Sequence, residues 1–184
     1  MEEKNKAWKT VSSKYLFRRP WLTVRCEDML LPNGNHIPEY YILEYPDWVN
    51  TIAVTSDGQF VFIRQYRHGL RKTSYELCAG VCEKEDASPL VSAQRELLEE
   101  TGYGNGTWRE FMQISPNPGT HTNITYCFLA TDVEKISEQH LEDTESLSVH
   151  LLTLTEVKEL LEKGEIKQAL MAAPLWKYIA EKGL

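Results

Sequence analysis

Hydrophobic and polar residues alternate with a period of two over much of the first third of the chain, from Tyr15 to Arg67. This alternation is typical of strands that bury one face of a sheet. The Asn33-Gly34 and Asp57-Gly58 pairs interrupt the pattern and favour tight hairpin turns. We therefore predict an N-terminal β-meander. Its strands form two hairpins and comprise residues 21–31, 38–45, 50–56 and 59–67.

The period changes to about 3.6 residues after position 88, which predicts a helix. Ser88 can accept a hydrogen bond at the N-cap, and Pro89 suits the first helical position. Gly102 offers the left-handed residue that ends a helix, so we expect the helix to span residues 89–101. Its apolar stripe faces the core and contains Leu90, Ala93 and Leu97, with Val91 and Leu98 beside it.

The rest of the chain mixes strands and helices. One helix is predicted from Thr155 to Lys163, and a second from Glu165 to Lys182. We expect a break in the second at Pro174, because proline has no N–H to continue the helical hydrogen bonds. This succession predicts an α/β (α+β) fold with a mixed sheet. The strands expected in this half are residues 107–114, 123–133 and 146–153.

Composition narrows the class of protein. The 184 residues are 42% hydrophobic and 26% charged, which is ordinary for a globular domain. A net charge of −7 argues against a nucleic-acid partner, since the phosphate backbone is bound by basic residues. The N-terminus MEEKNKAWK has no apolar signal region, and no run approaches the ~18 apolar residues that span a bilayer. We expect a cytoplasmic protein with no membrane association.

The four cysteines predict neither a disulfide framework nor a zinc site. A C-x3-C pair could form half of a zinc site, but no H-x3-H accompanies it. We interpret all four as reduced, mostly buried small hydrophobic residues: Cys26, Cys78, Cys82 and Cys127.

Three glutamates crowd one side of the predicted helix 89–101. Glu96, Glu99 and Glu100 lie within an arc of about 100° at helical spacing, and like charges at these spacings destabilise a helix. One interpretation is a solvated acidic face. The alternative is a site for a hard divalent cation, because Mg²⁺ takes carboxylate oxygens and completes its octahedron with water and phosphate. We favour Mg²⁺, with Mn²⁺ as a substitute.

The same residues carry a family resemblance. RELLEETGY, from Arg95 to Tyr103, resembles the core of the Nudix box, the motif of enzymes that hydrolyse nucleoside diphosphates linked to another moiety. Gly80 fits the opening glycine of that box. The count from Gly80 to Arg95 is one residue too long, and the expected glutamate between them is missing. Asp86, shifted by one position, is the residue that could replace it.

Further segments resemble the ADP-ribose pyrophosphatase branch of this family over residues 20–180. The resemblance implies a Nudix-type α/β/α sandwich at residues 47–184, preceded by the β-meander at residues 1–46. It also implies a homodimer, because in that branch the meander often crosses to a second subunit. The segments that carry the resemblance are RQYRHG (64–69), SYELCAG (74–80), the Pro-Gly loop (118–119) and SVHLLTLTEVKELLEKGEIKQA (148–169).

The resemblance implies that water attacks one phosphorus of a pyrophosphate and gives two monophosphates. ADP-ribose or a related ADP-sugar is the expected substrate. The implied metal ligands are the Gly80 carbonyl, Glu76, Glu96, Glu99 and Glu100. Glu99 and Glu100 are also predicted to be catalytic, and Asp143 and Glu145, in the loop before the last strand, are the candidates for the general base.

Substrate contacts follow from the same resemblance. Arg67 is predicted to bind phosphate, because a guanidinium pairs with two oxygens at once. His121 and Asn123 are candidates for contacts with ribose or base, and Phe17 and Trp21 for stacking on the base.

Two other functions stay open at this point. The segment after the Pro-Gly pair, residues 120–123, contains no acid where this branch often has one. The substrate could therefore be GDP-mannose or another nucleotide sugar. A catalytically silent Nudix domain that senses a nucleotide or sugar is the alternative outside enzymes, although it usually requires loss of the box glutamates, and all three are present.

Overall fold

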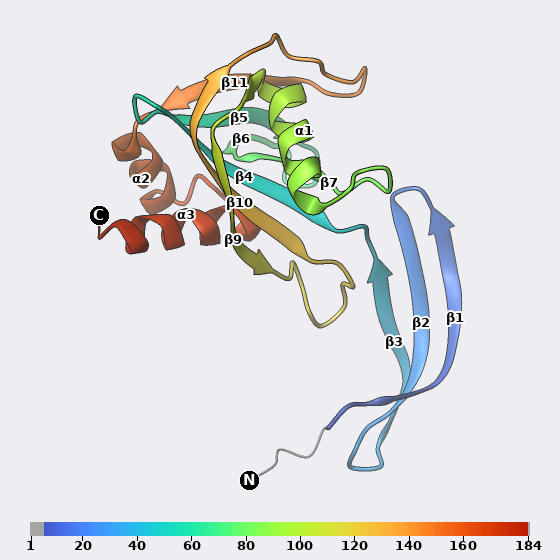
Figure 1. Cartoon of the computed structure of the whole chain (residues 1–184). Helices are drawn as coiled ribbons and strands as arrows, with labels where there is room; N and C mark the ends of the chain where they lie inside the picture. The colour runs from blue at the N-terminus through green and yellow to red at the C-terminus, as the bar shows by residue number, and fades with distance from the viewer. Residues whose placement is uncertain (1–5, 184) are drawn as a thin grey trace. The chain divides into compact units, whose positions relative to one another are not determined.

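The computed structural model describes residues 6–183, which form two compact units (Figure 1). The first unit contains residues 6–46 and 115–123, and the second contains residues 47–114 and 124–183. The first is built on a three-stranded antiparallel sheet in the order β1-β2-β3. Its strands are β1 (Lys9–Arg19), β2 (Leu22–Leu30) and β3 (His36–Glu44).

The hairpin of β2 and β3 confirms the strand prediction around Asn33-Gly34. Gly34 has φ +85°, and its N–H donates to the Leu31 carbonyl at 2.9 Å. β1 was missed for most of its length, because all of its residues are exposed and its sequence shows no clear alternation. The loop 115–123 joins this unit through two backbone hydrogen bonds between Leu43 and its neighbours in the loop, Thr120 (2.8 Å) and Thr122 (3.2 Å).

The second unit holds a mixed sheet with helices on both faces, which confirms the predicted α/β/α sandwich. The main path of the sheet is β11-β5-β4-β10-β8; β6 pairs with β5, β7 with β4 and β9 with β10. Among the described strands of this sheet, β4 and β10 are the one parallel pair. The strands are β4 (Trp48–Thr55), β5 (Phe60–Arg67), β6 (Lys72–Glu76), β7 (Cys78–Val81), β8 (Tyr103–Gly104), β9 (Thr107–Ile114), β10 (Thr125–Lys135) and β11 (Leu147–Leu152), and the helices are α1 (Pro89–Thr101), α2 (Leu154–Glu162) and α3 (Ala169–Lys182).

Alternating residues of β4 contribute to two hydrophobic clusters, one on each face of the sheet. Ile52 and Val54 pack in a cluster with side chains of α2 and α3. Ala53 points to the other face and packs with Leu97 of α1. Figure 1 accordingly shows α1 on one side of the sheet and α2 with α3 on the other. The period-two pattern of the sequence thus becomes two buried faces.

Strands β6 and β7 fill a gap inside the sheet. β4 and β5 pair only at Ala53–Val61 and Val54–Phe60 and then diverge. β6 runs along β5, and β7 returns along β4, so the segment 72–81 occupies the space between them. These strands were not predicted, because each is at most five residues long and shows no periodicity of its own.

The observed helices agree with the predicted helices within about one residue, except at the start and in the middle of α3. α1 spans the predicted residues 89–101. α3 begins at Ala169 rather than at Glu165, and it continues through Pro174 instead of breaking there. Pro174 leaves the Leu170 carbonyl, four residues earlier, without its helical donor. The buried side chain of Asn50 replaces that donor, with Nδ2 at 2.8 Å from the carbonyl oxygen. Within residues 6–183, no helix is long and apolar enough to cross a bilayer.

Candidate active site

Helix α1 carries the acidic cluster, and both of its ends are fixed locally. The Ser88 side chain accepts from the Val91 N–H at 3.4 Å, and Pro89 follows as the first helical residue. Gly102 adopts φ 75°, and its N–H donates to the Leu98 carbonyl at 2.8 Å. The orientation of the glutamates is therefore set by a helix with defined start and end.

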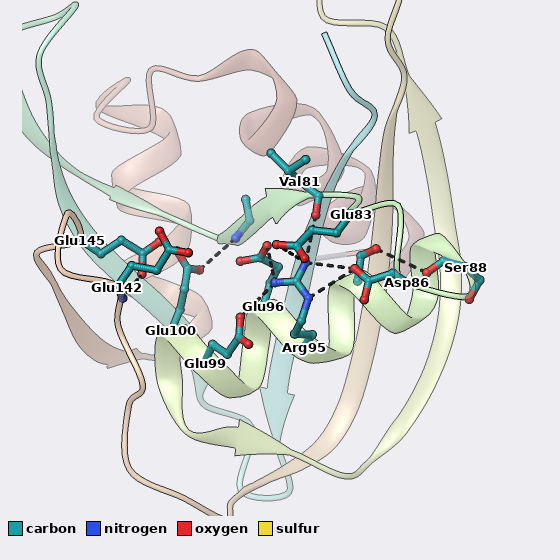
Figure 2. Close-up of polar contacts among 12 residues, drawn as sticks. Val81, Glu83, Asp86, Ser88, Arg95, Glu96, Glu99, Glu100, Glu142 and Glu145 are labelled. Atoms are coloured by element: carbon teal, nitrogen blue, oxygen red, sulfur yellow. Dashed lines mark hydrogen bonds and ion pairs between the residues drawn. The ribbon is translucent and has the colours of Figure 1, made fainter. Parts of the chain in front are cut away.

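Arg95 is the centre of an ion-pair network that spans the Nudix-like segment (Figure 2). Its Nη1 lies 3.0 Å from Glu96 Oε1 and 3.0 Å from Glu99 Oε2. Its Nη2 lies 3.1 Å from Asp86 Oδ2 and donates to the Val81 carbonyl at 3.1 Å. Asp86 thus supports the arginine in place of the missing glutamate, and the extra residue before α1 does not prevent the contact. Arg95 in turn lowers the pKa of Asp86.

Glu100 is a buried carboxylate, with 4% of its surface exposed. Its Oε2 accepts from the Ala79 N–H at 3.1 Å, and the Cys78 thiol is a second hydrogen-bond partner. The pKa of Glu100 is raised to about 7. Burial is the largest cause, and the charges of Glu96 and Glu145 act in the same direction, while the two hydrogen bonds oppose them. A carboxyl group that is buried at such a cost in desolvation free energy indicates a functional rather than a structural role.

Glu96 lies against the backbone of β7 at Gly80. A side chain at Gly80 would place its Cβ 2.1 Å from the Glu96 carboxylate, so only glycine leaves room for it. Burial raises the pKa of Glu96, and the charges of Glu99 and Glu145 act in the same direction, whereas Arg95 lowers it. Glu100, which is buried, and Glu96, which is half-buried, therefore share one region. Among residues 6–183, Arg95 is the cationic side chain that pairs with Glu96.

The donor set of this region fits a hard divalent cation. Glu96, Glu99, Glu100 and Glu145 offer carboxylate oxygens here, which are the ligands that hard cations prefer. Burial is the main cause of the raised pKa values of Glu96 and Glu100, and neighbouring carboxylates act in the same direction. Within residues 6–183, no three acidic, histidine or cysteine side chains already converge on one point. Because Glu99 pairs with Arg95, its carboxylate would have to leave this partner to join an ion held by Glu96 and Glu100.

The predicted general-base loop lies at the same cluster. Glu145 is half-buried and close enough to raise the pKa of both Glu96 and Glu100. Figure 2 shows Glu142 and Glu145 beside Glu100. Asp143 is exposed. Of the two candidates, Glu145 is the one that the structure brings to the carboxylates.

Arg67 does not present a free guanidinium fork. Its Nε lies 3.0 Å from both oxygens of Glu76, and its Nη2 lies 2.6 Å from Oε2. Glu76 is buried, and it also accepts from the Ser74 hydroxyl at 3.3 Å. The Arg67 side chain remains 43% exposed. The expectation that Glu76 binds a metal ion stays a prediction, and it would require this carboxylate to give up bonds to Arg67.

A cavity of about 440 Å³ opens beside this pair, between β6 and β7 and the start of α3. Two polar atoms that border it, Asn50 Oδ1 and Thr125 Oγ1, are buried without a hydrogen-bond partner among residues 6–183. Sequence reasoning missed this cavity, because the residues that form it are distant in the chain. Its lining comprises Trp48, Val49, Asn50, Arg67, Leu70, Ser74, Glu76, Ala79, Gly80, Val81, Thr125, Lys167, Gln168, Leu170 and Met171.

The other predicted substrate contacts lie in the first unit. Phe17 and Trp21 are 55% and 74% exposed, which is high for large aromatic side chains. The His121 ring contacts that of Tyr45, with centroids 5.3 Å apart. Asn123 is 2% exposed, and neither of its side-chain polar atoms has a partner in the described part of the chain. Their roles stay predictions.

The fold and the arrangement on α1 agree with family comparisons. Residues 45–173 match the NUDIX domain, which covers well over half of the chain. Residues 8–43 match the nucleoside diphosphate sugar hydrolase N-terminal domain. The chain therefore belongs to the Nudix hydrolase family, whose members generally use divalent metal ions.

Individual relatives span most of the chain. An ADP-ribose pyrophosphatase of Bacillus subtilis (strain 168) is 32% identical over 88% of this chain and 86% of its own length. A methanol dehydrogenase activator of Bacillus methanolicus is 30% identical over 86% and 85%. A GDP-mannose pyrophosphatase of Klebsiella pneumoniae is 28% identical over 59% of this chain and 54% of its own length. A crystal structure of an ADP compounds hydrolase has the same fold, with a TM-score of 0.80, 20% identity and 96% of both chains covered.

Proposed function

We propose that the chain hydrolyses the pyrophosphate bond of a nucleoside diphosphate linked to another moiety, and that ADP-ribose or a related ADP-sugar is the substrate. Two monophosphates are the products. The observation that carries this proposal is the burial of the Glu100 carboxyl beside Glu96 and Glu145, which gathers three carboxyl groups where ionisation of Glu100 costs desolvation free energy. The Nudix domain and the pyrophosphatase relatives make such a pyrophosphohydrolase the best-supported reading of that site.

Mg²⁺ is the proposed cofactor, and Mn²⁺ is its substitute. Glu96, Glu99, Glu100 and the Gly80 carbonyl would hold it, since they supply the oxygen ligands that hard cations prefer. When bound, the ion would neutralise the diphosphate and promote ionisation of the attacking water. This assignment also explains why the carboxylates are tolerated together.

The remaining roles are assigned to side chains on either side of the cluster. Glu145 is the preferred general base, because it lies at the carboxylates, and exposed Asp143 is the second candidate. Arg67, held in position by Glu76, would bind a phosphate oxygen with the exposed part of its guanidinium. The cavity beside it would receive one end of the substrate, where Asn50 and Thr125 offer unused hydrogen-bonding atoms.

The first unit is proposed to be a dimer-forming domain, with the boundary at residues 46 and 47. Its sheet and the turn between β1 and β2 expose large apolar side chains, including Phe17 and Trp21, and a second copy of the chain would cover them. In the dimer these aromatic side chains, together with His121 and Asn123, would contact the base or ribose. Light scattering tests this part of the proposal, and a monomer at micromolar concentration would contradict it.

GDP-mannose is the second candidate substrate. The segment 120–123 has no carboxylate, and a GDP-mannose pyrophosphatase is among the relatives. A silent sensor is the third possibility, but the chain retains Glu96, Glu99 and Glu100.

One substrate panel separates these functions. Purified protein is incubated with ADP-ribose, GDP-mannose, NADH and diadenosine polyphosphates, with Mg²⁺ or with EDTA, and the products are resolved by HPLC. We expect metal-dependent release of AMP and ribose 5-phosphate. Glu99→Gln should reduce kcat by orders of magnitude, whereas the control Glu138→Gln should not, because that side chain is 89% exposed and outside the cluster. Ligand binding without any product would support the sensor, and normal turnover by Glu99→Gln would reject the site.

A further inference from the structure

The loop after β10 is hydrogen-bonded to the C-terminal end of α1 through both backbone and side-chain donors. The N–H groups of Ile136 and Ser137 donate to the Gly102 carbonyl at 2.8 and 3.1 Å. The His140 N–H donates to the Glu99 carbonyl at 2.9 Å, and the Gln139 side-chain Nε2 donates to the Glu100 carbonyl at 2.6 Å. The last carbonyls of a helix have no partner within it, so these donors satisfy groups that water would otherwise bind.

The loop backbone packs closely against the helix end at Gly102. A Cβ at Gly102 would lie 2.1 Å from the Ser137 carbonyl oxygen, so the loop backbone sits directly on the glycine. The two carbonyls bound by Gln139 and His140 belong to the glutamates of the acidic cluster. The loop is therefore attached to the backbone that carries the proposed metal ligands.

A short turn connects this attachment to the proposed general base. The Glu145 N–H donates to the Glu142 carbonyl at 2.9 Å, and the Glu142 N–H donates to Glu145 Oε2 at 3.0 Å. Only Leu141 separates His140 from that turn. The turn is fixed internally. Only Ser146 separates it from β11, whose first residue Leu147 pairs with Gln65, so its position over Glu100 depends on β11 on one side and on the attachment to α1 on the other (Figure 2).

We propose that Gln139 is a positioning residue for the reaction: its side-chain amide ties the loop to α1 and so places the Glu142–Glu145 turn over the carboxylates. Of the donors in the attachment, Gln139 supplies the one side-chain group, so substitution can remove it without altering the backbone. The proposal rests on the proposed function, in which Glu145 serves as the base. A displaced base lowers turnover steeply, since about 1 Å of misplacement can cost about 100-fold.

The test compares three variants at Gln139 with a neighbouring control. Gln139→Met keeps the length of the side chain and removes the donor, and Gln139→Lys restores a donor at similar reach. Glu138→Gln is the control, because the Glu138 side chain is 89% exposed and its one ion pair in the described part of the chain is with Lys135 at 3.5 Å. Gln139→Glu keeps the shape but opposes the carbonyl with a negative charge. Hydrogen exchange of residues 140–145 and steady-state kinetics are measured for each variant.

We expect Gln139→Met and Gln139→Glu to speed exchange in residues 140–145 and to lower kcat about 10-fold or more with little change in KM. Gln139→Lys should retain most of the wild-type exchange protection and kcat. Glu138→Gln should change neither the exchange rate nor kcat. In the Glu145→Gln background, Gln139→Met should lower kcat less than twofold, because the group that it positions is gone.

Two results would overturn the inference. Unchanged exchange in Gln139→Met would show that the amide does not hold the loop. An equal loss of kcat with and without the Glu145 carboxylate would show that Gln139 does not act through it. Failure of the proposed function looks different, because the wild-type protein would then release no product from any nucleotide sugar, while the exchange comparison would still decide whether Gln139 fixes the turn.

Discussion

Replacing Glu100 with glutamine should stabilise the metal-free protein while it abolishes the reaction. The carboxylate is 4% exposed, and burial beside Glu96 and Glu145 raises its pKa from an ordinary value of 4.5 to about 7. At about 1.4 kcal/mol for each pKa unit, this difference of about 2.5 corresponds to about 3.5 kcal/mol. Glutamine keeps an oxygen for the Ala79 N–H and has no charge to desolvate.

The pH dependence gives the prediction its sign. Below pH 4.5 the group is protonated in both the folded and the unfolded chain, so Glu100 and glutamine should differ little. Between pH 4.5 and about 7 the folded state holds a proton that the unfolded chain releases, so the stability of the wild-type protein falls as pH rises. Above pH 8 the full cost of about 3.5 kcal/mol is present. For a chain of this size it corresponds to about 7–14 °C in Tm.

Thermal melts in EDTA from pH 5 to pH 8.5 measure this difference. Glu99→Gln is the matched control, because the Glu99 side chain is 43% exposed and pairs with Arg95, so it should gain no stability at high pH. We also expect Mg²⁺ to raise the Tm of the wild-type protein at pH 8.5 and to have much less effect on Glu100→Gln. A Glu100→Gln protein that melts at or below the wild-type temperature at pH 8.5 in EDTA would refute the reasoning.

Three further predictions test other parts of the structure. Gly80→Ala should lower kcat at least about 10-fold, because the new Cβ displaces the Glu96 carboxylate. Tm should change little, since the displaced atoms are the end of a flexible side chain, and unchanged kinetics would place Glu96 outside the site. Asn50→Ala should lower the free energy of unfolding by about 1–3 kcal/mol, because it leaves the Leu170 carbonyl unpaired. The loss should be smaller in a Pro174→Ala background, where residue 174 regains the N–H that pairs with this carbonyl. Equal losses in the two backgrounds, measured by urea titration, would contradict this account. Saturating Mg²⁺ should raise Tm more at pH 8 than at pH 5, since the ion binds ionised carboxylates, and no shift at either pH would remove the metal site.

Local patterns predicted most elements of the fold. Ser88, Pro89 and Gly102 determine the bounds of α1 by chemistry within a few residues, and the structure has the same bounds. The hairpins at Asn33-Gly34 and Asp57-Gly58 follow from turn residues in the same way. Pro174 shows where such reasoning fails, because Asn50 is far away in the sequence and supplies the hydrogen bond that lets α3 continue.

The candidate site was also predicted in part from local patterns and decided in part by tertiary contacts. Helical spacing alone placed Glu96, Glu99 and Glu100 on one side of α1, and the motif around Arg95 indicated the family. Asp86 was expected to be a shifted substitute, and only the folded loop shows that its carboxylate reaches Arg95. The contact depends on the path of the loop between β7 and α1, which no local pattern specifies.

By itself, the sequence determined the helix that carries the carboxylates, the strands with strict alternation and the membership of a family, because each depends on residues that are near neighbours in the chain. The tertiary structure decided the burial of Glu100, the pairing of Arg67 with Glu76 and the attachment of Gln139 to the end of α1. Each of these is a contact between separate elements, and its energy depends on desolvation and distance, which exist only once the chain is folded.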